Sequence, residues 1–128
     1  MLPAPELDLA YRSSRLPEGA VHQGIAIKVQ PLEPANLEDV TAAPDAPARL
    51  CVLDQISDPH NLGAIFRSAA AFGVGGLVLQ TRHTPPLTGV VAKSAAGAVE
   101  TVQEIRVVNI ARALDTLGAA GYHSVGLA

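Results

Sequence analysis

Two kinds of apolar pattern take turns along residues 49–128 of this chain: short continuous runs and stripes at helical spacing. The run RLCVLDQ is short and continuous, which is typical of a strand that is buried on both faces. The next segment, 61–72, carries an apolar stripe at helical spacing, and Gly73 follows it as a C-terminal glycine would. The stripe consists of Leu62, Ile65, Phe66, Ala69 and Phe72.

The same alternation continues to the last residue. GGLVLQ predicts a second buried strand, PPLTGVVAKSAAGAVE a short helix and turn, and ETVQEIRVV a third strand. NIARALDTLGAAG predicts a second clear helix with Asn109 as its N-cap, and HSVGLA predicts a fourth strand. The pattern therefore predicts an α/β fold, a parallel Rossmann-like sheet with right-handed crossovers. The apolar face of the second helix carries Ile110, Ala113, Leu114 and Leu117.

Neither pattern is sustained in residues 1–48. VHQGIAIKVQPL alternates around Ile25, Ile27 and Val29, which predicts one half-buried strand, and a Pro- and Ala-rich stretch of linker composition follows. We therefore expect the tail of an N-terminal domain over 1–41, a linker over 42–48 and the α/β layer over 49–128. A strand without a partner at one end and a sheet that stops inside a strand at the other indicate a piece of a larger protein.

Composition narrows the functional classes. A net charge of −3 and a pI near 5.7 argue against a broad basic surface for nucleic acid, although a local cationic site or a dimer cleft stays open. Two Tyr, two Phe and no Trp leave no base-stacking platform. The single cysteine, Cys51, excludes an intrachain disulfide and fits a small buried hydrophobe better than a reactive thiol. Since neither a signal peptide nor a membrane-length apolar run is present, we expect a cytoplasmic protein without membrane contact.

Polar residues gather where the first strand gives way to the first helix. Ligands of an open parallel sheet bind beyond the carboxyl ends of its strands, where we expect residues 54–61. Asp58 and Asn61 are each candidates for the helix N-cap, with Pro59 fixing the turn, and Asn61 could instead present its amide to a ligand.

Arg67 is the one charged residue of this helix pattern. It lies about 160° around the helix from the apolar stripe, and no carboxylate stands three or four residues from it. It is either a solvated arginine or a cation available to a phosphate, an oxyanion or another subunit.

Small residues dominate the segment KSAAGAVE, and their density permits a tight helix–helix or dimer contact. The histidines at 22, 60, 83 and 123 lack the spacing of a ligand set, so we expect no metal site. No phosphate-binding loop, nucleophile elbow or dinucleotide fingerprint is present in the required context.

Two stretches nevertheless resemble a known family. LDQISDPHNLGAIFRSAAAFGV resembles the first motif of the TrmH-type (SpoU) RNA ribose 2′-O-methyltransferases of the SPOUT class. VAKSAAGAVE followed by IRVVNIARAL continues the resemblance, with Lys93, Gly97, Ala98 and Glu100 at the family's lysine and Gly-Ala-x-Glu. VHQGIAIKVQPL is similar to the end of the small N-terminal RNA-binding domain of the large-subunit rRNA guanosine methyltransferases, so the resemblance covers roughly residues 8–128.

The resemblance implies a homodimeric enzyme that transfers a methyl group from S-adenosylmethionine to the ribose 2′-hydroxyl of a guanosine in rRNA or tRNA. It implies catalytic roles for Asn61 and Arg67 and RNA contacts for Arg67 and Lys93. The family's later motifs, which form a trefoil knot that binds the cofactor, would lie beyond residue 128. We therefore expect no cofactor-binding residue here and no activity from this chain alone. The alternative is a non-catalytic α/β module for dimerisation or RNA binding.

Overall fold

Three of the predicted strands form one parallel sheet. The computed structural model describes residue 30 and residues 32–127, and its helices and strands belong to one compact unit that begins at Glu33. Strands β1 (Leu50–Leu53), β2 (Gly76–Gln80) and β3 (Gln103–Val107) lie in the order β1-β2-β3. Leu53 pairs with Leu79, which pairs with Arg106, so the three carboxyl ends meet at one edge. The predicted parallel α/β fold is confirmed.

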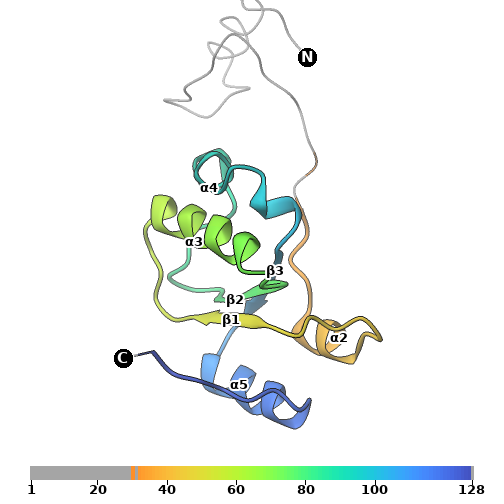
Figure 1. The fold of residues 1–128 in the computed structure, drawn as a ribbon. Helices are drawn as coiled ribbons and strands as arrows, with labels where there is room; N and C mark the ends of the chain where they lie inside the picture. Colours follow the sequence, from red (N-terminus) through yellow and green to blue (C-terminus); the bar gives the residue numbers. More distant parts are fainter. Residues whose placement is uncertain (1–29, 31, 128) are drawn as a thin grey trace, which may run out of the picture. The chain divides into compact units, whose positions relative to one another are not determined.

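Helices cover both faces of this sheet. The first face is covered by α3 (Pro59–Ala71) and α4 (Gly89–Ala95), followed by a short 3₁₀ turn, η1 (Ala98–Glu100). The other face is covered by α2 (Leu37–Ala42) and α5 (Ile110–Ala119). Figure 1 shows α3 and α4 on one side of the sheet and α5 on the other.

Strand β2 contributes to both apolar cores. Leu77 and Leu79 are fully buried against α3 and α4, whereas Val78 is fully buried with Ile105 on the side of α2 and α5. Side chains of a strand alternate between its faces, so a strand covered on both sides must be apolar at every position. This is why the run GGLVLQ shows no alternation.

Helix α2 lies in the stretch that the composition assigned to the N-terminal segment. Leu37 and Val40 are buried beneath the sheet, and the Ala35 N–H donates to the Glu104 carbonyl oxygen at 2.7 Å, which ties this stretch to β3. Only two buried apolar positions mark this short helix, too few for a periodic signal. The division into 1–41, 42–48 and 49–128 stays a prediction, and the predicted strand around Ile25, Ile27 and Val29 lies outside the described residues.

Some sequence predictions are wrong. HSVGLA does not form a strand over its described residues 123–127, which join none of the three strands, and Val125 is 85% exposed. Phe72 is 74% exposed because it follows the last helical turn of α3 as the C-cap residue and leaves the apolar stripe. Leu114 of α5 is also exposed, at the margin of the predicted apolar face.

Helices α3 and α4 come closest together at Gly63. A Cβ atom at this position would lie 2.3 Å from the Ser94 Cβ and 2.8 Å from the Val91 carbonyl oxygen, so only glycine fits between the two helices. Ala95 and Ala98 are buried in the same core. The small residues of KSAAGAVE therefore make the tight helix–helix contact that their density permits.

Gly63→Ala should destabilise the fold by about 1–3 kcal/mol, because the added methyl group forces α4 away from α3. Thermal unfolding followed by circular dichroism measures the change. The matched control is Gly118→Ala in α5, where an added Cβ meets nothing within 4 Å. Alanine favours a helix by about 1 kcal/mol over glycine, so the control should be as stable as the parent or more so. Equal stability of the two variants would contradict the close approach.

Candidate functional site

The carboxyl edge of the sheet carries the polar loops. Residues 54–58 follow β1 and residues 81–88 follow β2 at this edge. Each loop contains a non-glycine residue in the left-handed region, Gln55 with φ 54° and His83 with φ 69°. Such residues are uncommon and cluster at ligand-binding sites and switch regions. The edge predicted to bind a ligand is therefore also where the backbone is strained.

Asp58, not Asn61, caps helix α3. The Asp58 carboxylate accepts a hydrogen bond from the His60 N–H at 2.8 Å, and Pro59 is the first helical residue. The helix consequently begins two residues before the predicted position. The Asn61 side chain is exposed and makes no hydrogen bond within the described part of the chain. Its amide is therefore free to meet a ligand.

Arg67 projects into solvent, as the helical pattern predicts. Its side chain is exposed and has neither an ion-pair nor a hydrogen-bond partner among residue 30 and residues 32–127. Six residues separate it from Asn61, which corresponds to about 120° around the helix and about 9 Å along its axis. The two predicted catalytic residues thus stand on different flanks of α3, and the helix alone does not bring them together.

The flank that carries Asn61 borders a shallow apolar groove. The groove has a volume of about 470 Å³, and Arg67 is not part of its lining. No charged side chain lines it. Its lining residues include Cys51, Ile56, Asn61, Ile65, Ser68 and Phe72.

The flank that carries Arg67 faces toward α4. His60 lies seven residues before Arg67 and therefore on the same side of the helix, and its Nδ1 is 3.2 Å from the Ser94 Oγ. Lys93, the residue before Ser94 in α4, is exposed. Arg67 and Lys93 thus both reach solvent from the α3–α4 layer.

Charge is divided between the two helical layers. Neither α3 nor α4 contains a carboxylate, although Glu100 follows in η1. The first turn of α2 carries Glu38 and Asp39, and α5 carries Asp115 beside Arg112. The α3–α4 helices are therefore cationic although the whole chain carries a net charge of −3.

The Gly-Ala-x-Glu positions form the turn after α4. Ala96 and Gly97 are both left-handed, with φ 50° and 87°, and reverse the chain. Ala98 then enters the core, and Glu100 is exposed. Two of these residues thus have a structural role, and Glu100 is available to solvent.

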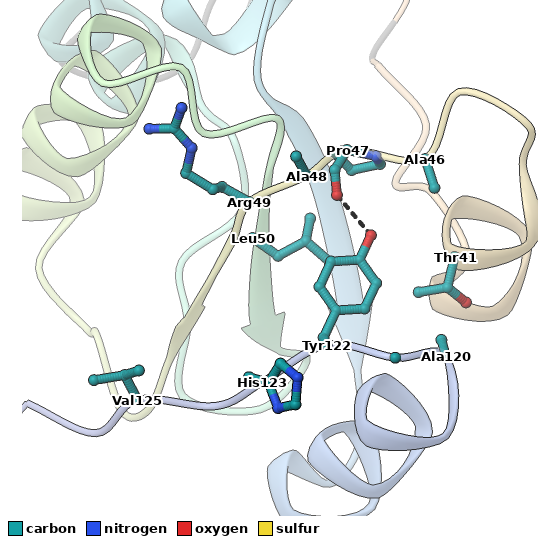
Figure 2. A pocket seen from close by; sticks show the side chains of 11 residues that line it. Thr41, Ala46, Pro47, Ala48, Arg49, Leu50, Ala120, Tyr122, His123 and Val125 are labelled. Atoms are coloured by element: carbon teal, nitrogen blue, oxygen red, sulfur yellow. Dashed lines mark hydrogen bonds between the residues drawn. The ribbon is translucent and has the colours of Figure 1, made fainter.

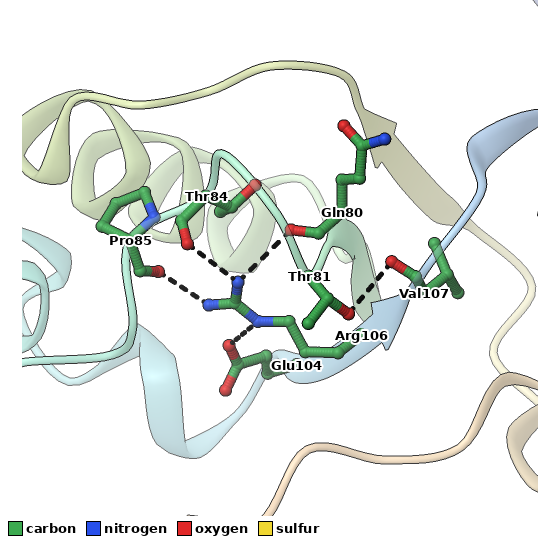
Figure 3. Close-up of polar contacts among 7 residues, drawn as sticks. All are labelled: Gln80, Thr81, Thr84, Pro85, Glu104, Arg106 and Val107. Carbon is green, nitrogen blue, oxygen red and sulfur yellow. Dashed lines mark hydrogen bonds and ion pairs between the residues drawn. The ribbon is translucent and has the colours of Figure 1, made fainter.

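Sequence analysis missed Arg106, whose guanidinium closes the loop after β2. Its Nε donates to the Glu104 Oε1 at 2.6 Å, and its Nη2 donates to the Pro85 carbonyl oxygen at 2.7 Å (Figure 3). Its Nη1 donates to the carbonyl oxygens of Thr84 at 3.2 Å and Gln80 at 3.5 Å. The available signal was an Arg and a Glu two residues apart in a strand, since such residues share one face.

A second hollow lies away from both Asn61 and Arg67. It has a volume of about 650 Å³ and lies beside the start of β1, where the Tyr122 hydroxyl donates to the Pro47 carbonyl oxygen at 2.6 Å (Figure 2). Neither Asn61 nor Arg67 lines it. Within the described ranges no group of three or more His, Cys, Asp or Glu side chains could hold a metal ion, and no helix is long and apolar enough to cross a membrane.

Comparison with known proteins places these residues in a family. The model of the SpoU rRNA Methylase family matches residues 48–128. The 23S rRNA (guanosine-2'-O-)-methyltransferase RlmB of Vibrio cholerae is 44% identical over 114 residues, which are 87% of this chain and 46% of the relative. An uncharacterized tRNA/rRNA methyltransferase of Synechocystis, slr0955, is 43% identical over 119 residues, 91% of this chain and 31% of the relative. The chain thus spans between about a third and a half of the length of these relatives.

Asp58→Ala should lower the free energy of unfolding by about 1 kcal/mol, because it removes the acceptor that caps α3. Asn61→Ala should change it by less than about 0.5 kcal/mol, since that side chain is exposed and does not cap the helix. Urea unfolding of both variants and of Asp58→Asn, which keeps a capping oxygen, measures the difference. A larger loss from Asn61→Ala than from Asp58→Ala would refute the assignment of the cap.

Cys51 should react slowly with iodoacetamide in the folded chain. Burial raises the pKa of its thiol, so less of the reactive thiolate is present at neutral pH than in an exposed cysteine. The rate should rise only at a pH above the range in which a free thiol ionises. Alkylation of the chain unfolded in urea is the reference, and equal rates in the folded and unfolded chains would contradict the prediction.

Proposed function

The chain belongs to the SpoU rRNA Methylase family, and from this premise we propose that it forms the substrate side of an RNA 2′-O-methyltransferase. The observation that carries the proposal is the exposed Arg67, which has no partner in the described ranges and stands on α3, a helix that, like its neighbour α4, contains no carboxylate. A cation in such a setting is free to meet the ribose and phosphate of an RNA strand.

The chemistry assigns different tasks to Arg67 and Asn61. A ribose hydroxyl is a poor nucleophile. Methyl transfer to it therefore depends on aligning the hydroxyl oxygen with the methyl group and on stabilising the charge that develops on that oxygen. A guanidinium is not a proton acceptor in proteins, and Arg67 therefore acts as an electrostatic donor, not as a base. The proton of the hydroxyl passes to a phosphate oxygen of the RNA or to water. Asn61 orients a reacting group through its free amide.

The separation of the two residues on α3 favours a site shared between two copies of the chain. In this arrangement Arg67 of one protomer reaches the hydroxyl held near Asn61 of its partner. Lys93, which reaches solvent from the same layer as Arg67, contacts a phosphate of the bound RNA. Because RlmB carries the name of a 23S rRNA guanosine methyltransferase, the proposed substrate is a guanosine of rRNA.

S-adenosylmethionine is the proposed methyl donor, and the described residues do not form its site. The groove beside Asn61 offers no charged group to the donor's amino acid end, and the larger hollow lies away from both catalytic candidates. We therefore propose that this chain binds the RNA and that the methyl donor binds outside the described residues. The lack of a donor site also favours a second candidate function, an RNA-binding module without transfer activity.

In a protein that continues this chain to the length of its relatives, Arg67→Ala should slow methyl transfer by about 100- to 1,000-fold, because one donor to the developing oxyanion is lost. RNA affinity should fall much less. Arg67→Lys should stay impaired, since it keeps the charge but lacks the guanidinium fork. Single-turnover transfer of a tritiated methyl group from S-adenosylmethionine to an rRNA transcript measures the rate, and fluorescence anisotropy measures RNA affinity.

Arg112→Ala on α5 is the control and should retain full activity. Parallel losses of rate and affinity in the Arg67 variants would make Arg67 a binding residue. Transfer by none of these proteins, with RNA still bound, would favour the non-catalytic module.

A further inference from the structure

The middle of the loop between β2 and α4 is held by Arg106, whose side chain is largely enclosed. The guanidinium donates to the carbonyl oxygens of Gln80, Thr84 and Pro85, which enclose it (Figure 3). Glu104 neutralises it, and the two side chains are only 15% and 7% exposed. Arg106 is thus fully engaged inside the protein and is not itself available to a ligand.

The start of the loop is also tied to β3, the strand that carries Arg106. The backbone N–H and the hydroxyl of Thr81 both donate to the Val107 carbonyl oxygen, at 2.8 Å and 3.1 Å. Thr84 is 8% exposed, so the loop is anchored on both sides of Arg82 and His83. His83 is held in the left-handed region, which costs an L-residue conformational energy that the anchors must supply. Arg82 and His83 form the tip of this loop, and the backbone of the tip is ordered before any ligand binds.

Arg82 is the cation of this tip. Its side chain is exposed and has no hydrogen-bond or ion-pair partner in the part of the chain that the structure describes. The loop TRHTPPLT contains no carboxylate, and it leads directly into α4, which carries Lys93. It also leaves the sheet at the carboxyl edge, where α3 begins and Asn61 lies. A guanidinium whose backbone is already ordered loses less conformational freedom on binding.

We propose that Arg82 is a phosphate contact for the RNA substrate and that Arg106 is the positioning residue that holds it in place. The inference rests on the proposed function and adds a contact outside the motif that contains Asn61 and Arg67. RNA is favoured over an acidic protein because the tip stands at the same edge as Asn61 and the fork of an arginine matches a phosphate.

The first test compares Arg82→Ala with Arg112→Ala, which removes an equal charge from α5 on the other side of the sheet. Fluorescence anisotropy of a labelled rRNA stem-loop transcript is measured with the 128-residue chain over a range of salt concentrations. Arg82→Ala should weaken binding several-fold and reduce the slope of log K against log salt by about 0.7–0.9 in magnitude, which corresponds to one phosphate. Arg112→Ala should leave both unchanged.

The second test asks whether Arg106 acts through Arg82. Arg106→Met alone would leave Glu104 as a buried unpaired carboxylate, so the test uses the isosteric pair Glu104→Gln with Arg106→Met. This pair should weaken RNA binding to the same extent as Arg82→Ala, and adding Arg82→Ala to it should cause no further loss. If the pair does not fold, Thr81→Val, which removes one anchor, should show a smaller loss with the same lack of additivity.

The outcomes separate this inference from the proposed function. Unchanged affinity and slope in Arg82→Ala, with the parent chain binding RNA, would overturn the contact and leave the proposed function standing. Equal effects of Arg82→Ala and Arg112→Ala would overturn it as well, because net charge alone would then explain the loss. Full additivity of the Arg106 and Arg82 changes would overturn the positioning role. A parent chain that binds no RNA at low salt would overturn the proposed function, and this contact with it.

Discussion

The burial of β2 on both faces is the constraint on which the rest of this fold depends. Its side chains alternate between two apolar cores: Leu77 and Leu79 pack in the α3–α4 layer, and Val78 packs in the α2–α5 layer. Because β1 and β3 pair with β2 in parallel, their carboxyl ends are brought to one edge together with the start of α3. Asn61 and the loop that carries Arg82 therefore belong to a single edge of the sheet. The position of the candidate site is thus a consequence of strand pairing.

Most of the fold was predictable because it rests on local periodicity. The three strands and the helices α3, α4 and α5 each have a run or stripe that is visible in the sequence. The start of α3 was misplaced because Asp58 and Asn61 are equally good caps until the geometry is known. The prediction for HSVGLA was wrong for another reason: an apolar alternation shows that a segment is able to pair, but not that it does pair.

The sequence proposes residues for the candidate site but does not show their arrangement. The resemblance points to Asn61, Arg67 and Lys93, whose roles stay predictions, and helical spacing alone shows that Arg67 leaves the apolar stripe. The division of charge between the layers was hidden, because the net charge of the chain averages over both. Arg106 was hidden because its three carbonyl partners lie 21 to 26 residues away in the sequence, beyond the reach of any local pattern.

Helix α5 lies on the face of the sheet opposite to α3 and α4, and this has a consequence for any strand that follows it (Figure 1). Right-handed crossovers through α3 and α4 carry the chain from β1 toward β3. A right-handed crossover through a helix on the opposite face adds the next strand in the reverse direction, so that strand would lie beside β1. In sheets wound outward in both directions, ligands bind in the crevice where the winding reverses. That crevice would open at the tip of β1, and the first turn of α3 would form one of its walls.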